Sequence, residues 1–261
     1  MLKLSGWSRV AAATVIGMVA SGAMADISGS HAAFMIHAQN ENGASATFQL
    51  GANDLFQDEN GNYWWATQNQ MTFNDPTSGE EVFTLNPEGR ETSMYTIQDP
   101  QVTLNFAVQS GGSATTFTIA SALLTFAPIT NGTARAGSSV TITDINGAGP
   151  AGTTARLLGS SPTGSGMSYL TQFNGFAPLN TGTTFVEQIA SVSETLPFQS
   201  ESASANQPFT LVPGAVSSMS SVMQFSLSAR DIAAGNAIFE IVPEPASIAL
   251  LSLGLLALRR R

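Results

Sequence analysis

Hydrophobic and polar residues alternate along much of the chain between residues 26 and 242. The clearest case is QVTLNFAVQ (101–109), in which Val102, Leu104 and Phe106 fall on one side and polar residues on the other. A period of two is typical of a β-strand that is buried on one face only. We therefore predict a half-buried strand over 101–109.

The next apolar stretch, 114–127, also alternates, but its apolar residues change sides midway. This change predicts a bulge or bend near Ser121. The pair Gly111-Gly112 separates this stretch from the strand at 101–109, and a short glycine turn between two strands predicts a β-hairpin.

Further short β-prone segments are separated by Asn-Gly and Pro-Gly turn signals. They lie at 46–50, 62–68, 81–85, 93–98, 138–145, 221–229 and 236–242, and the segment 183–192 fits either a strand or a short helix. Many short strands with turns between them predict an all-β fold, an antiparallel β-sandwich or jelly roll, in one domain over residues 26–242. The Ser/Gly/Thr-rich stretch 147–166 is predicted to be a long loop.

The first 25 residues have the polarity order of a secretory signal peptide. A basic start with Lys3 and Arg9 precedes a short apolar run, and Ala23 and Ala25 form an A-x-A cleavage site. We predict a signal helix over residues 1–25 that passes through the secretory translocon, and a mature chain that begins at Asp26.

The other end of the chain holds an apolar run of 13 residues, 246–258. As a helix this run spans about 20 Å, whereas the hydrocarbon core of a bilayer is about 30 Å thick. A permanent membrane anchor is therefore not expected. Because three arginines follow the run directly, its polarity favours transient insertion into the inner membrane with the arginines at the cytoplasmic face.

The order of features in residues 243–261 resembles the PEP-CTERM protein-sorting signal. Pro243, Glu244 and Pro245 come first, then a hydrophobic helix, then the terminal residues Arg259, Arg260 and Arg261. The resemblance covers about twenty residues and implies recognition by an exosortase after export in a Gram-negative bacterium. It also implies a place in the cell envelope, at the cell surface or in the extracellular matrix, with links to exopolysaccharide or biofilm.

Charge is scarce and one-sided in the region between the two terminal segments. Residues 26–258 carry four arginines, no lysine and all 18 carboxylates, a net charge of −14. A phosphate backbone requires a basic surface, so nucleic-acid binding is excluded. The acidity favours solubility in an external medium over weak cation binding. The absence of cysteine excludes disulfides, thiolate nucleophiles and cysteine-based metal sites.

Two patterns could suggest a metal site. His31 and His37, six positions apart, would share a face of a continuous strand but need a third ligand from elsewhere, and the segment QDENGNYWW (57–65) is the more tempting of the two. Asp58, Asn60 and Asn62 stand at alternate positions, as the first ligands of a calcium loop do. The match fails at the sixth and twelfth positions, where such a loop needs Gly and Glu. We therefore favour a hairpin with Asn60-Gly61 at a type I′ turn.

The same segment ends in three adjacent aromatic residues, Tyr63, Trp64 and Trp65. Because side chains alternate along a strand, we expect one tryptophan to enter the core and the other to face outward. Packing in the core or at an edge is the favoured interpretation. An outward tryptophan that stacks on a sugar ring is the alternative.

No catalytic arrangement stands out in the sequence. The chain has no G-x-S-x-G elbow, its only histidines are His31 and His37, and neighbouring acidic residues on a strand point to opposite faces. We therefore expect a protein that is not an enzyme and needs no cofactor, with a structural or adhesive role near exopolysaccharide. A carbohydrate-binding module that uses Trp64 or Trp65 is the second hypothesis, and a secreted hydrolase the third.

Overall fold

The computed structural model describes residues 26–28, 31–97, 99–147 and 154–243. These residues form nineteen strands in two antiparallel sheets, with three 3-10 turns and no α-helix among them. The predicted all-β, antiparallel fold is confirmed. The two flanking helices that the sequence predicts, in 1–25 and 246–258, lie outside the described residues.

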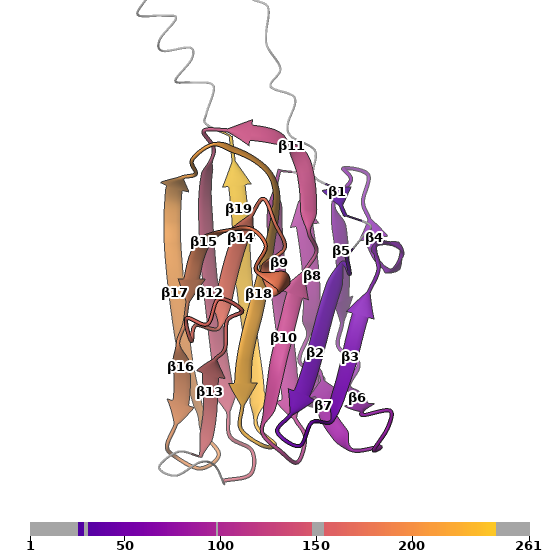
Figure 1. Cartoon of the computed structure of the whole chain (residues 1–261). Helices are drawn as coiled ribbons and strands as arrows, with labels where there is room; N and C mark the ends of the chain where they lie inside the picture. The colour runs from indigo at the N-terminus through magenta and orange to yellow at the C-terminus, as the bar shows by residue number, and fades with distance from the viewer. Residues whose placement is uncertain (1–25, 29–30, 98, 148–153, 244–261) are drawn as a thin grey trace, which may run out of the picture.

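The ten-stranded sheet is organised around the long strand β18 (Figure 1). Met223 of β18 pairs with Ile119 on one side and with Tyr169 on the other, so the sheet continues in both directions. Along its main path the order is β1 (Asp26–Ile27), β11 (Leu124–Thr130), β18 (Ala215–Leu227), β10 (Thr115–Ser121), β2 (Phe34–Asn40) and β3 (Ser45–Leu50), and the opposite edge of β18 carries β13 (Ala155–Gly159) and β14 (Tyr169–Phe173), which pair with β16 (Ser191–Glu194) and β15 (Thr183–Gln188).

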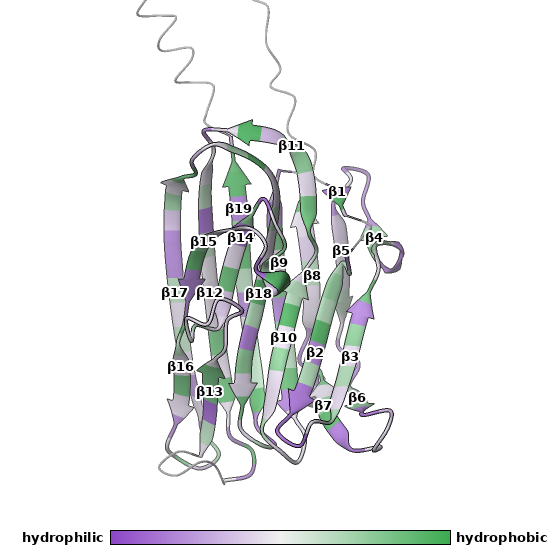
Figure 2. Ribbon diagram, in the orientation of Figure 1, coloured by the Kyte–Doolittle hydropathy of each residue, from purple (hydrophilic) through white to green (hydrophobic). Residues whose placement is uncertain are grey.

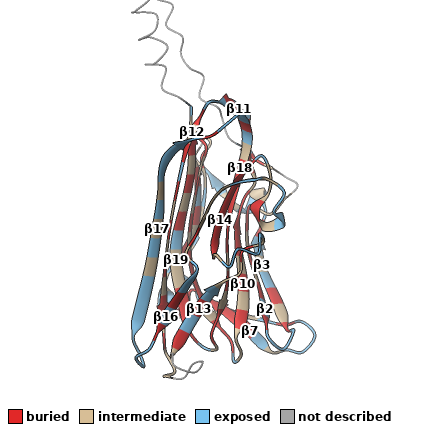
Figure 3. Ribbon diagram, turned by 60° about the vertical axis from the view of Figure 1, so that its left-hand side comes forward, coloured by how far each residue is buried: buried red, intermediate tan, exposed pale blue. Residues whose placement is uncertain are grey.

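The nine-stranded sheet runs behind it, and its long edge strand β17 is largely exposed (Figure 3). Its order is β17 (Ser200–Leu211), β12 (Thr133–Thr143), β19 (Ile232–Val242), β9 (Gln101–Ser110), β8 (Thr92–Ile97), β5 (Tyr63–Thr67) and β4 (Phe56–Gln57), with β7 (Glu81–Leu85) on β9 and β6 (Met71–Asn74) on β7. The 3-10 turns are η1 (Ala52–Asp54), η2 (Pro87–Gly89) and η3 (Ala177–Leu179).

The two sheets pack face to face through a chain of aromatic rings. Ring centroids of Phe106 in β9 and Phe225 in β18 are 5.8 Å apart. Those of Phe83 in β7 and Phe117 in β10 are 5.9 Å apart. These contacts join one sheet to the other, as in a sandwich. Hydrophobic and polar residues alternate along the strands (Figure 2), and the predicted alternation of 101–109 is confirmed in β9.

The hairpin predicted at Gly111-Gly112 is wrong, because β9 and β10 belong to different sheets. The pair carries the chain across the sandwich. The Gly111 N–H donates to the Val82 carbonyl at 2.9 Å, and a Cβ at Gly111 would lie only 2.2 Å from the Glu81 carbonyl oxygen. Glycine is therefore required by this close backbone approach and not by a hairpin turn.

Other predictions are settled by the strand boundaries. The bend near Ser121 is confirmed, since β10 ends there and β11 begins at Leu124. The ambiguous segment 183–192 is extended: β15 and the start of β16 are separated by Ile189 and Ala190, and the φ of Ile189 is 60°. The predicted loop at 147–166 is interrupted by β13.

Both ends of the described chain lie at the same end of the sandwich (Figure 1). Asp26 in β1 pairs with Thr125 of β11, and Val242 at the end of β19 pairs with Thr133 of β12. The segments that precede Asp26 and follow Pro243 are therefore joined to one end of the sandwich.

Candidate functional site

The three adjacent aromatic residues lie on β5, and their side chains alternate between the two faces of the sheet. Trp65 points inward, with its ring centroid 6.0 Å from Phe34 and 5.4 Å from Phe48. Tyr63 also packs against the core, while Trp64 faces outward and is 42% exposed. The expectation of one inward and one outward tryptophan is confirmed.

Tyr63 closes the end of the sandwich where the chain emerges. Its hydroxyl donates a hydrogen bond to Asp26 Oδ1 at 3.2 Å. Partial burial, followed by the negative charge of Asp26, raises the pKa of Tyr63 above its usual value of 10.0. The side chain thus ties β5 to the first residue of the predicted mature chain.

Trp64 stands in a row of aromatic side chains that the sequence analysis did not find. Phe56 of β4 pairs directly with Trp64, and Trp64 pairs directly with Tyr95 of β8. Direct cross-strand partners share a face, and the rings of Phe56 and Trp64 are stacked at 4.8 Å. The exposed fractions are 59% for Phe56 and 38% for Tyr95. We call Phe56, Trp64 and Tyr95 the aromatic row.

A second row of small and polar residues runs beside the aromatic row. Ala66, Ser93, Asn105 and Asn236 lie two positions along from Trp64 and its partners and pair in sequence across β5, β8, β9 and β19. They therefore face the same side. Asn105 Nδ2 donates to Ser93 Oγ at 2.9 Å. We call Ser93, Asn105 and Asn236 the polar row.

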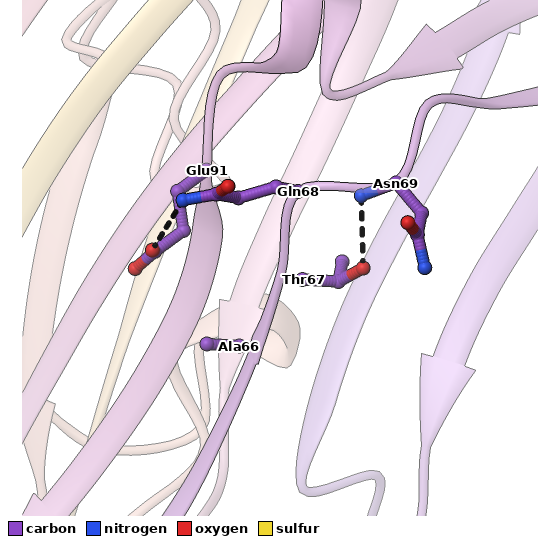
Figure 4. A pocket seen from close by; sticks show the side chains of 5 residues that line it. All are labelled: Ala66, Thr67, Gln68, Asn69 and Glu91. Carbon is purple, nitrogen blue, oxygen red and sulfur yellow. Dashed lines mark hydrogen bonds between the residues drawn. The ribbon is translucent and has the colours of Figure 1, made fainter.

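Beyond the polar row, the end of β5 forms a pocket of about 370 Å³ (Figure 4). Its lining is Ala66, Thr67, Gln68, Asn69 and Glu91. Gln68 Nε2 donates to Glu91 Oε2 at 3.4 Å, and the Asn69 N–H donates to Thr67 Oγ1 at 3.2 Å. The aromatic row, the polar row and this pocket thus follow one another along β5 and β8.

The loop that resembled a calcium site is a hairpin between β4 and β5. Asp58 Oδ1 accepts the N–H groups of Asn60 and Asn62, both at 2.9 Å, and Oδ2 accepts Asn62 Nδ2 at 2.8 Å. The side-chain hydrogen bond from Asn62 is the main cause that lowers the pKa of Asp58. Both oxygens of the Asp58 carboxylate are thus engaged by N–H donors from Asn60 and Asn62, as expected for a hairpin loop held by its own hydrogen bonds.

The turn type at this hairpin differs from the prediction. A type I′ turn needs positive φ at both central residues. Gly61 has φ of 81°, whereas Asn60 is not among the residues with positive φ. The loop is longer than a two-residue turn, because the Asp58 N–H donates to the Asn62 carbonyl at 3.0 Å. In the described part of the chain, no group of three His, Cys, Asp or Glu side chains could hold a metal ion.

A pair of buried carboxylates lies at the opposite end of the sandwich from the chain ends. Burial opposes ionisation of Asp144, but the N–H groups of Phe198, Gly147 and Asn146 outweigh it and lower its pKa. Burial raises the pKa of Asp231 to about 7, and the charge of Asp144 adds to this effect.

The surroundings of Asp231 make this pair a structural feature. Ser228 Oγ donates to Asp231 Oδ2, while Oδ1 is buried without a hydrogen-bond partner. The Asp231 side chain has no exposed surface. Sequence reasoning missed the pair, because two aspartates 87 positions apart carry no local signal.

The sorting residues fall mainly outside the described part of the chain. Pro243 follows the end of β19 and is exposed. Glu244, Pro245 and Arg259–Arg261 lie outside the described residues, as do Ala23 and Ala25 of the predicted cleavage site. In the ranges that the structure describes, no helix is long and apolar enough to cross a membrane.

Comparison with known proteins identifies a motif in the tail of the chain. Residues 242–261 match the PEP-CTERM protein-sorting motif. No curated protein matches the chain.

Two solved structures show weak likeness. The enzymatically active domain of tailspike protein 4 from bacteriophage CBA120 is 13% identical with a TM-score of 0.27, over 69% of this chain and 19% of that one. A structure of infectious bursal disease virus, Gx strain, is 11% identical with a TM-score of 0.24, over 87% of this chain and 68% of that one. The chain thus spans about a fifth of the tailspike chain.

Proposed function

We propose that this chain is a non-enzymatic protein of a Gram-negative bacterial surface, with a structural or adhesive role in an exopolysaccharide layer. The observation that carries the proposal is the PEP-CTERM motif at residues 242–261. This motif indicates export to the cell envelope or surface and implies an exosortase as the processing partner. The signal peptide predicted at residues 1–25 supplies the route through the translocon.

The position of the chain ends supports a role at a surface. Asp26 and Val242 lie at one end of the sandwich, so an attachment made at the processed C-terminus near Val242 would hold the sandwich by that end (Figure 1). Both outer sheet faces and the far loops then stay open to the surrounding layer. An adhesive or structural protein requires such access.

The chemistry of the titratable groups supports a role without catalysis. Burial raises the pKa of Asp231 to about 7, which is close to neutrality. Its side chain is enclosed, however, and no substrate could reach it. Asp75 has its pKa lowered to about 2, chiefly by the Ser45 N–H, and serves as a hydrogen-bond acceptor for loop backbone. A general acid or base must instead reach the reacting atom.

A second function, carbohydrate binding, is favoured by one specific observation. Trp64 is exposed and stands between two further exposed aromatic side chains, Phe56 and Tyr95. Exposed aromatic clusters on a folded surface are common at binding sites. This function is compatible with the first, because adhesion to an exopolysaccharide requires contact with sugars.

Fractionation of the host tests the proposed function. The native chain is compared with a variant that ends at Val242 and with a variant in which Glu244 is replaced by alanine. We expect the native chain in the surface or matrix fraction, and both variants displaced from it. Native chain found only in the cytoplasm, or an unchanged distribution of the variant that ends at Val242, would overturn the proposal.

A further inference from the structure

We infer that the aromatic row is a binding platform for an extended, uncharged polysaccharide chain that lies across the strands. The inference rests on the proposed function. It names the class of ligand and the direction in which the bound chain crosses the sheet. Phe56, Trp64 and Tyr95 come from three adjacent strands and share the outer face of the nine-stranded sheet. All three are more than a third exposed.

The chemistry of a sugar ring matches this face. A pyranose presents C–H groups on its flat sides and hydroxyl groups around its edge. The C–H groups interact favourably with the negative face of an aromatic ring. The hydroxyl groups require hydrogen-bond partners when water is displaced. The polar row supplies amide and hydroxyl groups from Ser93, Asn105 and Asn236 directly beside the rings.

The spacing of the strands gives the direction of the bound chain. Neighbouring strands are about 4.8 Å apart, which is close to the length of one sugar unit along an extended chain. Because Phe56 and Trp64 stack on each other, each covers one face of the other, so these two rings together offer one apolar contact and Tyr95 on the next strand offers another. The row continues through Thr103 and Ile238, the next cross-strand partners after Tyr95. A polysaccharide chain would therefore run from β4 over β5 and β8 toward β9 and β19.

The charges around the platform select against acidic polymers. Asp58 and Glu59 lie in the loop that joins β4 to β5, and Glu91 lines the pocket beside the polar row. Arg90, next to Glu91, is paired with Glu88 at 3.4 Å. With a net charge of −14 over residues 26–258, the field around the face repels carboxylated or sulfated chains. This repulsion of acidic polymers points to an uncharged ligand.

A second copy of this chain is the main competing occupant. Two aromatic rows could pack against each other in a symmetric dimer. The polar row and the nearby carboxylates disfavour this arrangement, because a dimer would place Asp58, Glu59 and their copies close together without cations. The oligomeric state is therefore one readout of the test.

The test uses the exported protein isolated from its host, as native chain and as the variants Trp64→Ala and Tyr95→Ala. Phe209→Ala is the matched control, because Phe209 is a 49% exposed aromatic on β17 of the same sheet, away from the row. Electrophoretic retardation is measured in gels that contain hydroxyethylcellulose, a neutral polysaccharide, or alginate, an acidic one. Tryptophan fluorescence is followed in parallel, since Trp64 and Trp65 are the only tryptophans after residue 25.

We expect the neutral polymer to retard the native chain and Phe209→Ala, and alginate to retard neither. Trp64→Ala and Tyr95→Ala should each weaken the retardation about tenfold or more, as truncation of a central aromatic contact does. Thermal unfolding of each variant checks its fold, and Tyr95→Ala keeps the test valid if Trp64→Ala is unstable.

Three results would overturn the inference: stronger retardation by alginate, equal retardation of all variants, or a row variant that changes only the oligomeric state. Each of them leaves the surface location, scored by host fractionation, untouched. If the protein is at the surface but fails the binding test, only the binding platform is refuted. If the protein binds the neutral polymer but is absent from the surface, the proposed function is refuted.

Discussion

Replacing Asp231 with asparagine removes one of the two buried carboxylates and keeps the shape of the side chain. Wild-type Asp231 has a pKa of about 7 in the folded protein and 3.8 as its reference value, chiefly because burial disfavours its charge. Well below pH 3.8 the residue is protonated in both the folded and the unfolded protein. Its contribution to stability is then unaffected by pH.

The sign of the effect follows from the raised pKa. Between pH 3.8 and 7 the unfolded chain loses this proton while the folded chain keeps it, so the free energy of unfolding falls as the pH rises. At 1.36 kcal/mol per pKa unit, the complete loss above pH 7 is roughly 4 kcal/mol. About 2–3 kcal/mol of it develops between pH 5 and pH 8 by the same relation.

The assay is urea unfolding of the wild type and Asp231→Asn at pH 5 and at pH 8. Other titrating groups are common to both proteins, so they cancel in the difference. We expect the variant to gain about 2–3 kcal/mol over the wild type between the two pH values. In thermal unfolding this gain corresponds to roughly 5–10 °C for a domain of this size. A difference that is independent of pH, or that favours the wild type more at pH 8, would refute the reasoning.

Three further substitutions test other parts of the structure by urea unfolding. Asp75→Asn should have a smaller free energy of unfolding than the wild type at pH 7, because N–H donors from Ser45, Ser78 and Thr77 hold the folded pKa of Asp75 at about 2. This difference in stability should shrink as the pH falls toward 2, and a difference that stays constant with pH would contradict the prediction. Gly111→Ala should lower the free energy of unfolding by roughly 3 kcal/mol, because its Cβ would meet the Glu81 carbonyl. In the control Gly112→Ala the added Cβ has no atom within 4 Å, so the free energy of unfolding should hardly change. Phe106→Ala should cost about 3–5 kcal/mol by leaving a cavity against Phe225, and a cost below about 1 kcal/mol would contradict the packing between the sheets.

Strands with one buried face could be predicted from the sequence, because their alternation survives in the structure. This holds for β9 and for β3, where Ala46 and Leu50 are buried as their spacing indicates. The alternation is lost in β14, which is buried at every position. The turn η3 covers its outer face, and Leu170 and Ala177 form part of a second small apolar cluster there. A strand covered on both sides shows no alternation.

Topology could not be predicted, because a turn signal is local and the choice of partner strand is not. Gly111-Gly112 has the composition of a hairpin turn, yet it connects two sheets. The polar strand β17 was missed for a related reason: it lies at an edge of the sandwich and none of its residues is buried. The sequence alone does not mark such an edge strand.

The candidate platform was only partly predictable. The aromatic triplet 63–65 points to Trp64, and period-two alternation correctly separates it from Trp65. Its neighbours Phe56 and Tyr95 lie 8 and 31 positions away, and only the register of β4, β5 and β8 brings them together. The aromatic row therefore needed the structure.

The most direct test of the central claim is the intact mass and the C-terminal peptide of the protein isolated from its host. If the tail is a sorting signal, the mature chain begins at Asp26 and ends between Val242 and Pro245. A chain that keeps residues 246–261 would contradict the account, and the apolar run would then have to act as a short anchor or a packed helix.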